Sequence, residues 1–170
     1  MTGIARLNIL AILFFTLSAC GGASTDAPRM AMPVLTDTDG VAIQGYDPVS
    51  YFVAGAAQQG SPEYSAEWGG ARWWFTSEAN RSRFLGDPEQ YAPAYGGWCA
   101  FGMAEGYAAE TDPVNGWTIH EGRLYLNWDA DVTSQWRATK ESYLERSEPN
   151  WPEVKRQLQD GSATIYWHEQ

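Results

Sequence analysis

Two sulfur-bearing side chains, Cys99 and Met103, have the residue types and spacing for metal chemistry. Cys99 follows two glycines at the expected start of a short helix, where the helix dipole favours a thiolate. Met103 stands four residues further on, so on that helix both sulfur atoms would share one face. A thiolate and a thioether are soft ligands that suit Cu(I), so the pair makes copper the candidate cofactor. Core packing is the more frequent role of such residues, because free cysteine and methionine are usually buried.

Other ligands could join this pair only through folding. No histidine stands at a sequence spacing that would complete the site, which leaves Tyr46, Asp47 or a residue near the amino terminus. His120 is expected on the solvent-facing side of a hairpin, beside its turn. His168 lies in the carboxyl-terminal tail, where it could ligate a metal or contact a partner, although chain ends are usually frayed or docked.

Catalytic motifs are missing from the sequence. It contains no HExxH pair, no phosphate-binding glycine loop, no calcium loop and no Ser/His/Asp arrangement at a supporting spacing. Its closely spaced carboxylates fall in segments that are expected to be loops: Asp37 and Asp39, Glu110 and Asp112, Asp129 and Asp131. The sequence therefore favours a non-enzymatic protein, with a thiol-dependent accessory or enzymatic role of Cys99 as the alternative.

The first twenty residues predict an export signal rather than part of a fold. Residues 1–8 carry one basic side chain, Arg6, and no acidic one, and residues 9–17 are apolar except for Thr16. This stretch is shorter than the ~20 apolar residues of a permanent membrane helix. It ends in Leu-Ser-Ala-Cys at residues 17–20, which resembles the lipobox of bacterial lipoproteins.

That resemblance implies a signal peptide over residues 1–19 and lipidation of Cys20. Two or more acyl chains such as palmitate, at about 0.8 kcal/mol per buried methylene, would anchor the protein stably to a membrane. Gly21 after the cysteine implies sorting to the outer membrane, facing the periplasm, because the family uses Asp there for a different destination. Cys99 would then have no disulfide partner.

The charge and the aromatic content narrow the partners and the source of stability. The chain has 11 basic and 21 acidic residues, a net charge of −10, and no basic run. Such a chain does not suit nucleic acid or anionic headgroups, whereas a protein partner in the envelope stays open. Nine Trp, nine Tyr and six Phe can supply a core without a disulfide, since each buries ~150–250 Å².

Two β-hairpins are predicted in the middle of the chain. The first joins residues 64–68 to 71–75 through two glycines, and the second joins residues 117–120 to 123–128 through Glu-Gly. The expected buried pairs are Trp68 with Ala71, Ala66 with Trp73, Tyr64 with Phe75, Ile119 with Leu124, and Trp117 with Leu126. Glu67 and Arg72 are expected to pair on the solvent-facing side of the first hairpin.

Helix signals surround these hairpins. Asp47 and Asp87 each precede a proline, and Ser77 precedes a short apolar-periodic stretch, so all three are expected as helix N-caps. Helical spacing predicts a helix over residues 131–146, and Asn150 with Glu153 resembles a capping box that starts a final helix. The prediction is a small compact α+β domain of two β-hairpins with short helices and a longer C-terminal helix.

Four ordered stretches resemble the exported YHS domain-containing proteins of bacteria. They are residues 45–52, 73–93, 95–102 and 122–128, with sequences such as Gly-Tyr-Asp-Pro-Val-Ser-Tyr-Phe and Tyr-Gly-Gly-Trp-Cys-Ala-Phe-Gly. The resemblance implies a YHS-like domain over residues 41–158. Residues 20–40 are then the lipidated start and a flexible tether, and residues 159–170 are a tail outside the resemblance.

The metal-binding thiols of related YHS modules are missing here. Modules of copper-transporting ATPases and some oxygenases carry cysteines proposed to bind metal, and Ser50, Thr76 and Asn80 stand at or near those places in this chain. The resemblance therefore implies the scaffold without that site. The expected function is a lipid-anchored binding module of the cell envelope, with copper handling as its most specific role and a purely scaffolding lipoprotein as a further alternative.

The surplus of aromatic residues offers another interpretation, a face that binds sugar or peptide. Trp74 and Tyr125 point away from the expected buried sides of the two hairpins, so together they could form a stacking platform. A second layer of core covering that face is the better-supported expectation for a domain so rich in tryptophan.

Overall fold

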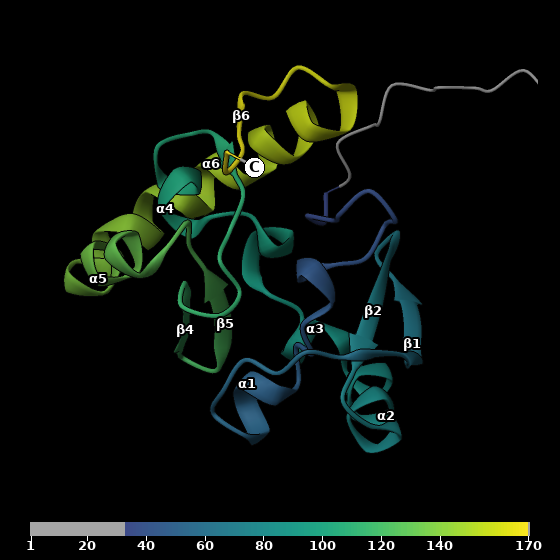
Figure 1. The fold of residues 1–170 in the computed structure, drawn as a ribbon. Coiled ribbons are helices and arrows are strands. Elements are labelled where there is room, and N and C mark those ends of the chain that lie inside the picture. Colours follow the sequence, from purple (N-terminus) through teal and green to yellow (C-terminus); the bar gives the residue numbers. More distant parts are fainter. Residues whose placement is uncertain (1–32, 170) are drawn as a thin grey trace, which may run out of the picture.

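Two antiparallel hairpins and a series of helices make up residues 33–169, the part of the chain that the computed structural model describes (Figure 1). The predicted α+β class, with short antiparallel sheets and helices, is confirmed. The expected signal peptide, Cys20 and most of the expected tether lie outside the described residues. None of the helices within residues 33–169 combines the length and apolarity needed to cross a membrane.

The first hairpin, β1 (Ser61–Trp68) and β2 (Ala71–Phe75), has the predicted register near its turn. Trp68 pairs with Ala71, Ala66 with Trp73, and Glu67 with Arg72. The predicted pair of Tyr64 with Phe75 is wrong, because the register shifts between Ser61 and Ser65 and Phe75 pairs with Ser61. Pro62 lies in the shifted stretch and has no N–H to donate to the ladder.

The second hairpin, β4 (Trp117–His120) and β5 (Arg123–Leu126), has the predicted register throughout. Its two turn residues, Glu121 and Gly122, have positive φ angles of 48° and 74°, as a type I′ turn requires. Alternate residues of β5 serve different cores: Leu124 and Leu126 enter the first core, and Tyr125 enters the second.

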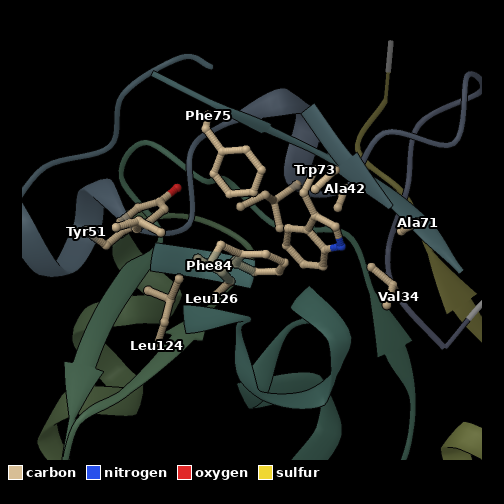
Figure 2. Close-up of a cluster of buried hydrophobic side chains, with 12 residues drawn as sticks. Val34, Ala42, Tyr51, Ala71, Trp73, Phe75, Phe84, Leu124 and Leu126 are labelled. Carbon is tan, nitrogen blue, oxygen red and sulfur yellow. The ribbon is translucent and has the colours of Figure 1, made fainter. Parts of the chain in front are cut away.

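The first core lies between the two hairpins (Figure 2). Trp73 and Phe84 pack with ring centroids 5.2 Å apart, and Phe75 contacts Phe84 at the same separation. Leu124 and Leu126 close this cluster from the side of β5. Phe84 comes from α2 (Glu78–Gly86), so that helix is held against β1 and β2.

The second core lies on the opposite side of β5, beneath the helices at the upper left of Figure 1. These helices are α4 (Ala100–Ala104), α5 (Ala130–Ala138) and α6 (Lys140–Asp160). Trp136 of α5 is fully buried and packs on Tyr125, with ring centroids 5.1 Å apart. The helices therefore cover the hairpin face that was considered as an exposed platform.

Short elements connect these layers. They are η1 (Ile43–Gly45), α1 (Ser50–Val53), α3 (Pro88–Tyr91), η2 (Ala94–Gly97), β3 (Ala108–Ala109) and β6 (Ile165–Tyr166).

The predicted caps Ser77 and Asp87 are confirmed, since each side chain accepts the expected backbone N–H. The predicted cap at Asp47 is wrong: α1 begins at Ser50, and its N-cap residue is Val49.

The predicted boundary between the last two helices is also wrong. The chain breaks at Thr139 instead of near residue 146, and α6 continues through Pro149 and Pro152. Asn150 does not cap a new helix. Its side-chain amide lies 3.1 Å from the carbonyl oxygens of both Met103 and Ala104, so a contact to α4 outweighs the local capping signal.

The packed structure extends past residues 41–158 at both ends. Val34 and Leu35 are buried, and Leu35 donates its N–H to the Gly96 carbonyl at 2.8 Å. In the tail, β6 pairs in parallel with β3. Trp167 follows β6 and packs on Trp98, with ring centroids 5.7 Å apart. Residues from the expected tether and tail therefore belong to the fold.

Candidate functional site

Asp47 is the centre of a buried polar network. Its side chain is fully buried, and Oδ1 accepts the N–H of Val49 at 2.8 Å. Oδ2 accepts three bonds, from the Thr76 N–H at 2.9 Å, the Thr76 hydroxyl at 2.8 Å and the Asn80 amide at 2.7 Å. Four donors around one carboxylate offset much of the cost of burying its charge.

Ser50, Thr76 and Asn80, the three residues that the resemblance to YHS modules predicts at or near the lost thiols, all lie at this network. Thr76 and Asn80 are bonded to Asp47, and the Ser50 hydroxyl lies 2.7 Å from the Asp47 carbonyl oxygen. The remaining side-chain oxygen of Asn80 accepts a hydrogen bond from Arg83 at 2.9 Å. Hydrogen bonds thus occupy both Asp47 oxygens, which the sequence had offered as metal ligands. Tyr46 packs against the first core.

Cys99 lies at the N-cap of α4 and is 2% exposed. Burial raises the pKa of its thiol, and this effect exceeds the opposing influence of the backbone N–H groups of Gly102, Trp128 and Phe101. Its sulfur lies 3.8 Å from the Asn127 side-chain oxygen. The helix start expected at Cys99 is present, but desolvation outweighs its stabilisation of a thiolate.

A small aromatic pocket of about 210 Å³ opens over Cys99. Its lining consists of Cys99, Phe101, Tyr107, Ala109, Trp128, Val132 and Tyr166. Met103 is absent from this lining and is fully buried in the second core. Within residues 33–169 no group of three or more His, Cys, Asp or Glu side chains is arranged to hold a metal ion.

The two histidines lie in different settings. His120 is half-buried at the end of β4, paired with Arg123 across the hairpin. Two polar contacts hold His168 in place. Its backbone N–H donates to the Glu110 side chain at 2.9 Å, and its ring Nε2 lies 3.0 Å from the Trp128 carbonyl oxygen. Its ring also packs on Trp128. The tail is therefore held in place by polar and aromatic contacts.

A larger groove, which the sequence patterns do not reveal, lies on another face. Two adjoining hollows of about 390 and 480 Å³ share six lining residues: Trp68, Glu89, Ala92, Pro93, Gly96 and Trp151. Lys155 and Gln159 line the first hollow, and Gln90 and Arg123 line the second. We call these two hollows together the tryptophan groove.

Packing on the inner side fixes the two indoles that line both hollows. Trp68, at the end of β1, contacts Phe84 with ring centroids 5.8 Å apart. Trp151, in α6, contacts Tyr95 at 5.8 Å. Both tryptophans are half-buried, so each is held by the core on one side and lines the groove on the other. Rigid, partly exposed indoles are typical of binding surfaces.

Three charged side chains of the groove come from three different elements. Glu89 belongs to α3, Arg123 begins β5, and Lys155 lies one turn after Trp151 on α6. The Lys155 ammonium lies 6.0 Å from the centroid of the Trp151 ring. All three polar residues are exposed. The groove therefore combines aromatic walls with charged and amide groups that can accept and donate hydrogen bonds.

The aromatic platform considered from the sequence does not form at Trp74 and Tyr125. Tyr125 is 5% exposed in the second core, and Trp74 is half-buried beside Gly45. A Cβ atom at Gly45 would lie 2.6 Å from the Trp74 ring, so the glycine allows this close approach. The groove instead uses Trp68, which the sequence pattern assigns to a buried face, together with Trp151.

Comparisons with protein-family models, with curated proteins and with solved structures found no match to this chain. The fold and the groove together define a small α+β domain with an aromatic, polar-lined groove on its surface.

Proposed function

We propose that this protein is a lipid-anchored module of the bacterial cell envelope that binds a saccharide chain in the tryptophan groove. The export signal and the Leu-Ser-Ala-Cys sequence at residues 17–20 support the anchor. The single observation that carries the binding role is the placement of Trp68 and Trp151 along both hollows of one groove.

The chemistry of the groove suits a sugar. The C–H face of a pyranose ring packs on an indole, and its hydroxyl groups both donate and accept hydrogen bonds. Glu89, Gln90 and Gln159 present planar acceptors and donors beside the two indoles. A pocket with aromatic walls and a few polar groups fixes both the affinity and the orientation of its ligand.

A peptide fits the groove less well. Extended peptides usually add a strand to a free sheet edge, and amphipathic helices need a continuous apolar channel. The hairpins contribute to the groove near their turns, through Trp68, Gly69, Gly122 and Arg123, and charged residues interrupt its apolar surface. These features favour a ligand recognised by side chains over one recognised through a backbone ladder.

We further propose that the scaffold is YHS-like and does not use the metal site of that family. The Asp47 network supports the absence of that metal site, because Ser50, Thr76 and Asn80, at or near the places where the related modules carry thiols, make hydrogen bonds there. Copper binding at Cys99 is not part of the proposed function. That pocket offers one buried thiol with a raised pKa, and Met103 does not line it.

Binding by the mature protein in detergent tests the proposed function. Oligosaccharides released from bacterial envelopes are titrated against the wild type, Trp151→Ala and Trp167→Ala. Trp167 packs on another aromatic ring, as Trp151 does, but it lies outside the groove, so Trp167→Ala is the control. We expect Trp151→Ala to weaken binding about tenfold or more, as loss of an aromatic anchor does, and Trp167→Ala to leave it unchanged. Equal binding by all three proteins would refute the groove as the site.

The anchor has its own test. In cells fed labelled palmitate, the wild-type protein should carry label and sediment with membranes. Cys20→Ser should lose both properties, whereas Cys99→Ser should keep them. Labelling that persists in Cys20→Ser would contradict the proposed lipidation.

A further inference from the structure

We infer that the saccharide chain in the tryptophan groove is acidic and carries carboxylates that bind Arg123 and Lys155. This inference rests on the proposed function and names its ligand class. Arg123 lines the hollow of about 480 Å³, and Lys155 lines the hollow of about 390 Å³. Each hollow thus has its own cation, with the two tryptophans common to both.

Arg123 and Lys155 differ from the other basic residues of the described chain in that their side chains have neither a hydrogen-bond nor an ion-pair partner there. Within residues 33–169, ion pairs with carboxylates occupy five basic side chains: Arg72, Arg81, Lys140, Arg146 and Arg156. Arg83 and Arg137 instead donate hydrogen bonds to neutral side chains or backbone carbonyls. Arg123 and Lys155 make no side-chain hydrogen bond or ion pair with any residue in the described part of the chain, and both of them line the groove.

Two unpaired cations are unexpected in so acidic a protein. The sequence has 21 acidic residues for 11 basic ones, so most basic side chains find a carboxylate nearby. The lining of the groove holds two cations, Arg123 and Lys155, against the one carboxylate of Glu89, so its side-chain charge is positive in a chain whose net charge repels anions generally. An acidic ligand would therefore be drawn to this groove and away from the rest of the surface.

Glu89 limits the kind of anion. It lines both hollows, so a compact dianion such as a phosphate would meet its repulsion wherever it bound. A carboxylated sugar chain spreads single charges along its length. One carboxylate can then face Arg123 and another Lys155, while Glu89 accepts hydrogen bonds from sugar hydroxyls between them. Tyr95 also lines the hollow that holds Arg123, and its hydroxyl donates to Glu148 at 3.0 Å.

A pair of probes that differ only in charge tests the inference. Oligogalacturonate carries a carboxylate on each sugar, and its methyl ester has the same backbone without the charges. Both are titrated against the mature protein in detergent. We expect esterification to weaken binding at least tenfold, and added salt to weaken the binding of the acid form alone.

Substitutions of Arg123 and Lys155 test whether these two cations cause the charge dependence of binding. Arg123→Gln and Lys155→Gln should each weaken oligogalacturonate binding about fivefold to tenfold, and the double variant should bind the acid and the ester alike. Arg156→Gln is the matched control, because Arg156 is next to Lys155 in sequence but already pairs with Glu153 and Asp160 outside the groove lining. It should bind like the wild type. Arg123→Lys should retain most of the affinity.

Different binding results would refute the acidic ligand alone or the saccharide site as well. Equal affinity for the acid and the ester, with binding still lost in Trp151→Ala, overturns the acidic ligand and leaves a saccharide site. Binding of the acid that is indifferent to Arg123→Gln and Lys155→Gln also overturns it. Binding of neither saccharide, with polyglutamate binding instead and lost in Trp151→Ala, overturns both and identifies an acidic peptide as the ligand.

Discussion

Asn80 donates its side-chain amide to the fully buried carboxylate of Asp47 across 2.7 Å, and this bond ties α2 to the loop before α1. The sequence makes Asp47 a candidate metal ligand, and the resemblance to YHS modules predicts Asn80 near a lost thiol. In the fold they belong to one hydrogen-bonded network. The network holds together segments that the first core then covers.

Replacing Asp47 should therefore destabilise the protein without any ligand present. Asp47→Asn introduces an N–H₂ group among the donors from Val49, Thr76 and Asn80, so at least one donor loses its acceptor. We expect a loss of about 2–4 kcal/mol in the free energy of urea unfolding. Asp39→Asn, at an exposed carboxylate, should change it by less than about 0.5 kcal/mol. A similar stability of both variants would contradict the structural role of the network.

The Cys99 thiol should react slowly in the folded protein. It is 2% exposed, and burial raises its pKa, so little thiolate is available to an alkylating reagent at neutral pH. Iodoacetamide labelling followed by mass spectrometry should proceed rapidly only in guanidinium chloride. Rapid labelling of the native protein would restore the thiol-dependent alternative.

Copper binding gives a separate prediction for the same residue. Cu(I) titration of the mature protein should show no site tighter than micromolar that depends on Cys99, because one buried thiol does not make a closed soft-ligand site. Cys99→Ser should therefore match the wild type. A tight site that disappears in Cys99→Ser would reinstate copper handling as the function.

Alkaline pH should weaken the fold through Tyr51. Burial is the largest cause that raises the pKa of Tyr51 above its ordinary value of 10.0, and its hydroxyl donates to the Pro113 carbonyl at 2.8 Å. A raised folded-state pKa contributes stability that is complete below pH 10 and is lost as the pH rises through the folded value. The free energy of unfolding should thus fall above about pH 10, and less steeply in Tyr51→Phe than in the exposed control Tyr166→Phe. Equal slopes in the two variants would exclude Tyr51 as a cause.

Local signals in the sequence predicted the parts of the fold that local interactions determine. The turn-proximal pairs Glu67–Arg72 and Ile119–Leu124 follow from alternation around a two-residue turn, and Ser77 caps its helix through a bond to its own third neighbour. The continuation of α6 past residue 146, where the sequence predicts a boundary, could not be predicted this way. It depends on the contact of Asn150 with α4, which only the folded chain creates.

The candidate site was predictable only in its parts. Trp68 was assigned to a buried face, and it does pack on Phe84, but its other side lines the groove. Lys155 and Arg123 gave no signal, since a single exposed cation is ordinary in a sequence. Their significance comes from what they lack, a carboxylate partner within residues 33–169, and from the assembly of α3, α6 and the two hairpins around them.

The tryptophan groove itself can be tested most directly by following the indole N–H signals of the ¹⁵N-labelled mature protein during titration with oligogalacturonate. We predict that the Trp68 and Trp151 signals shift together and saturably, while those of the buried Trp136 and the exposed Trp167 stay in place. Shifts confined to Trp128 or Trp167, or no shift of any indole at saturating ligand, would contradict the assignment of this groove as the binding site.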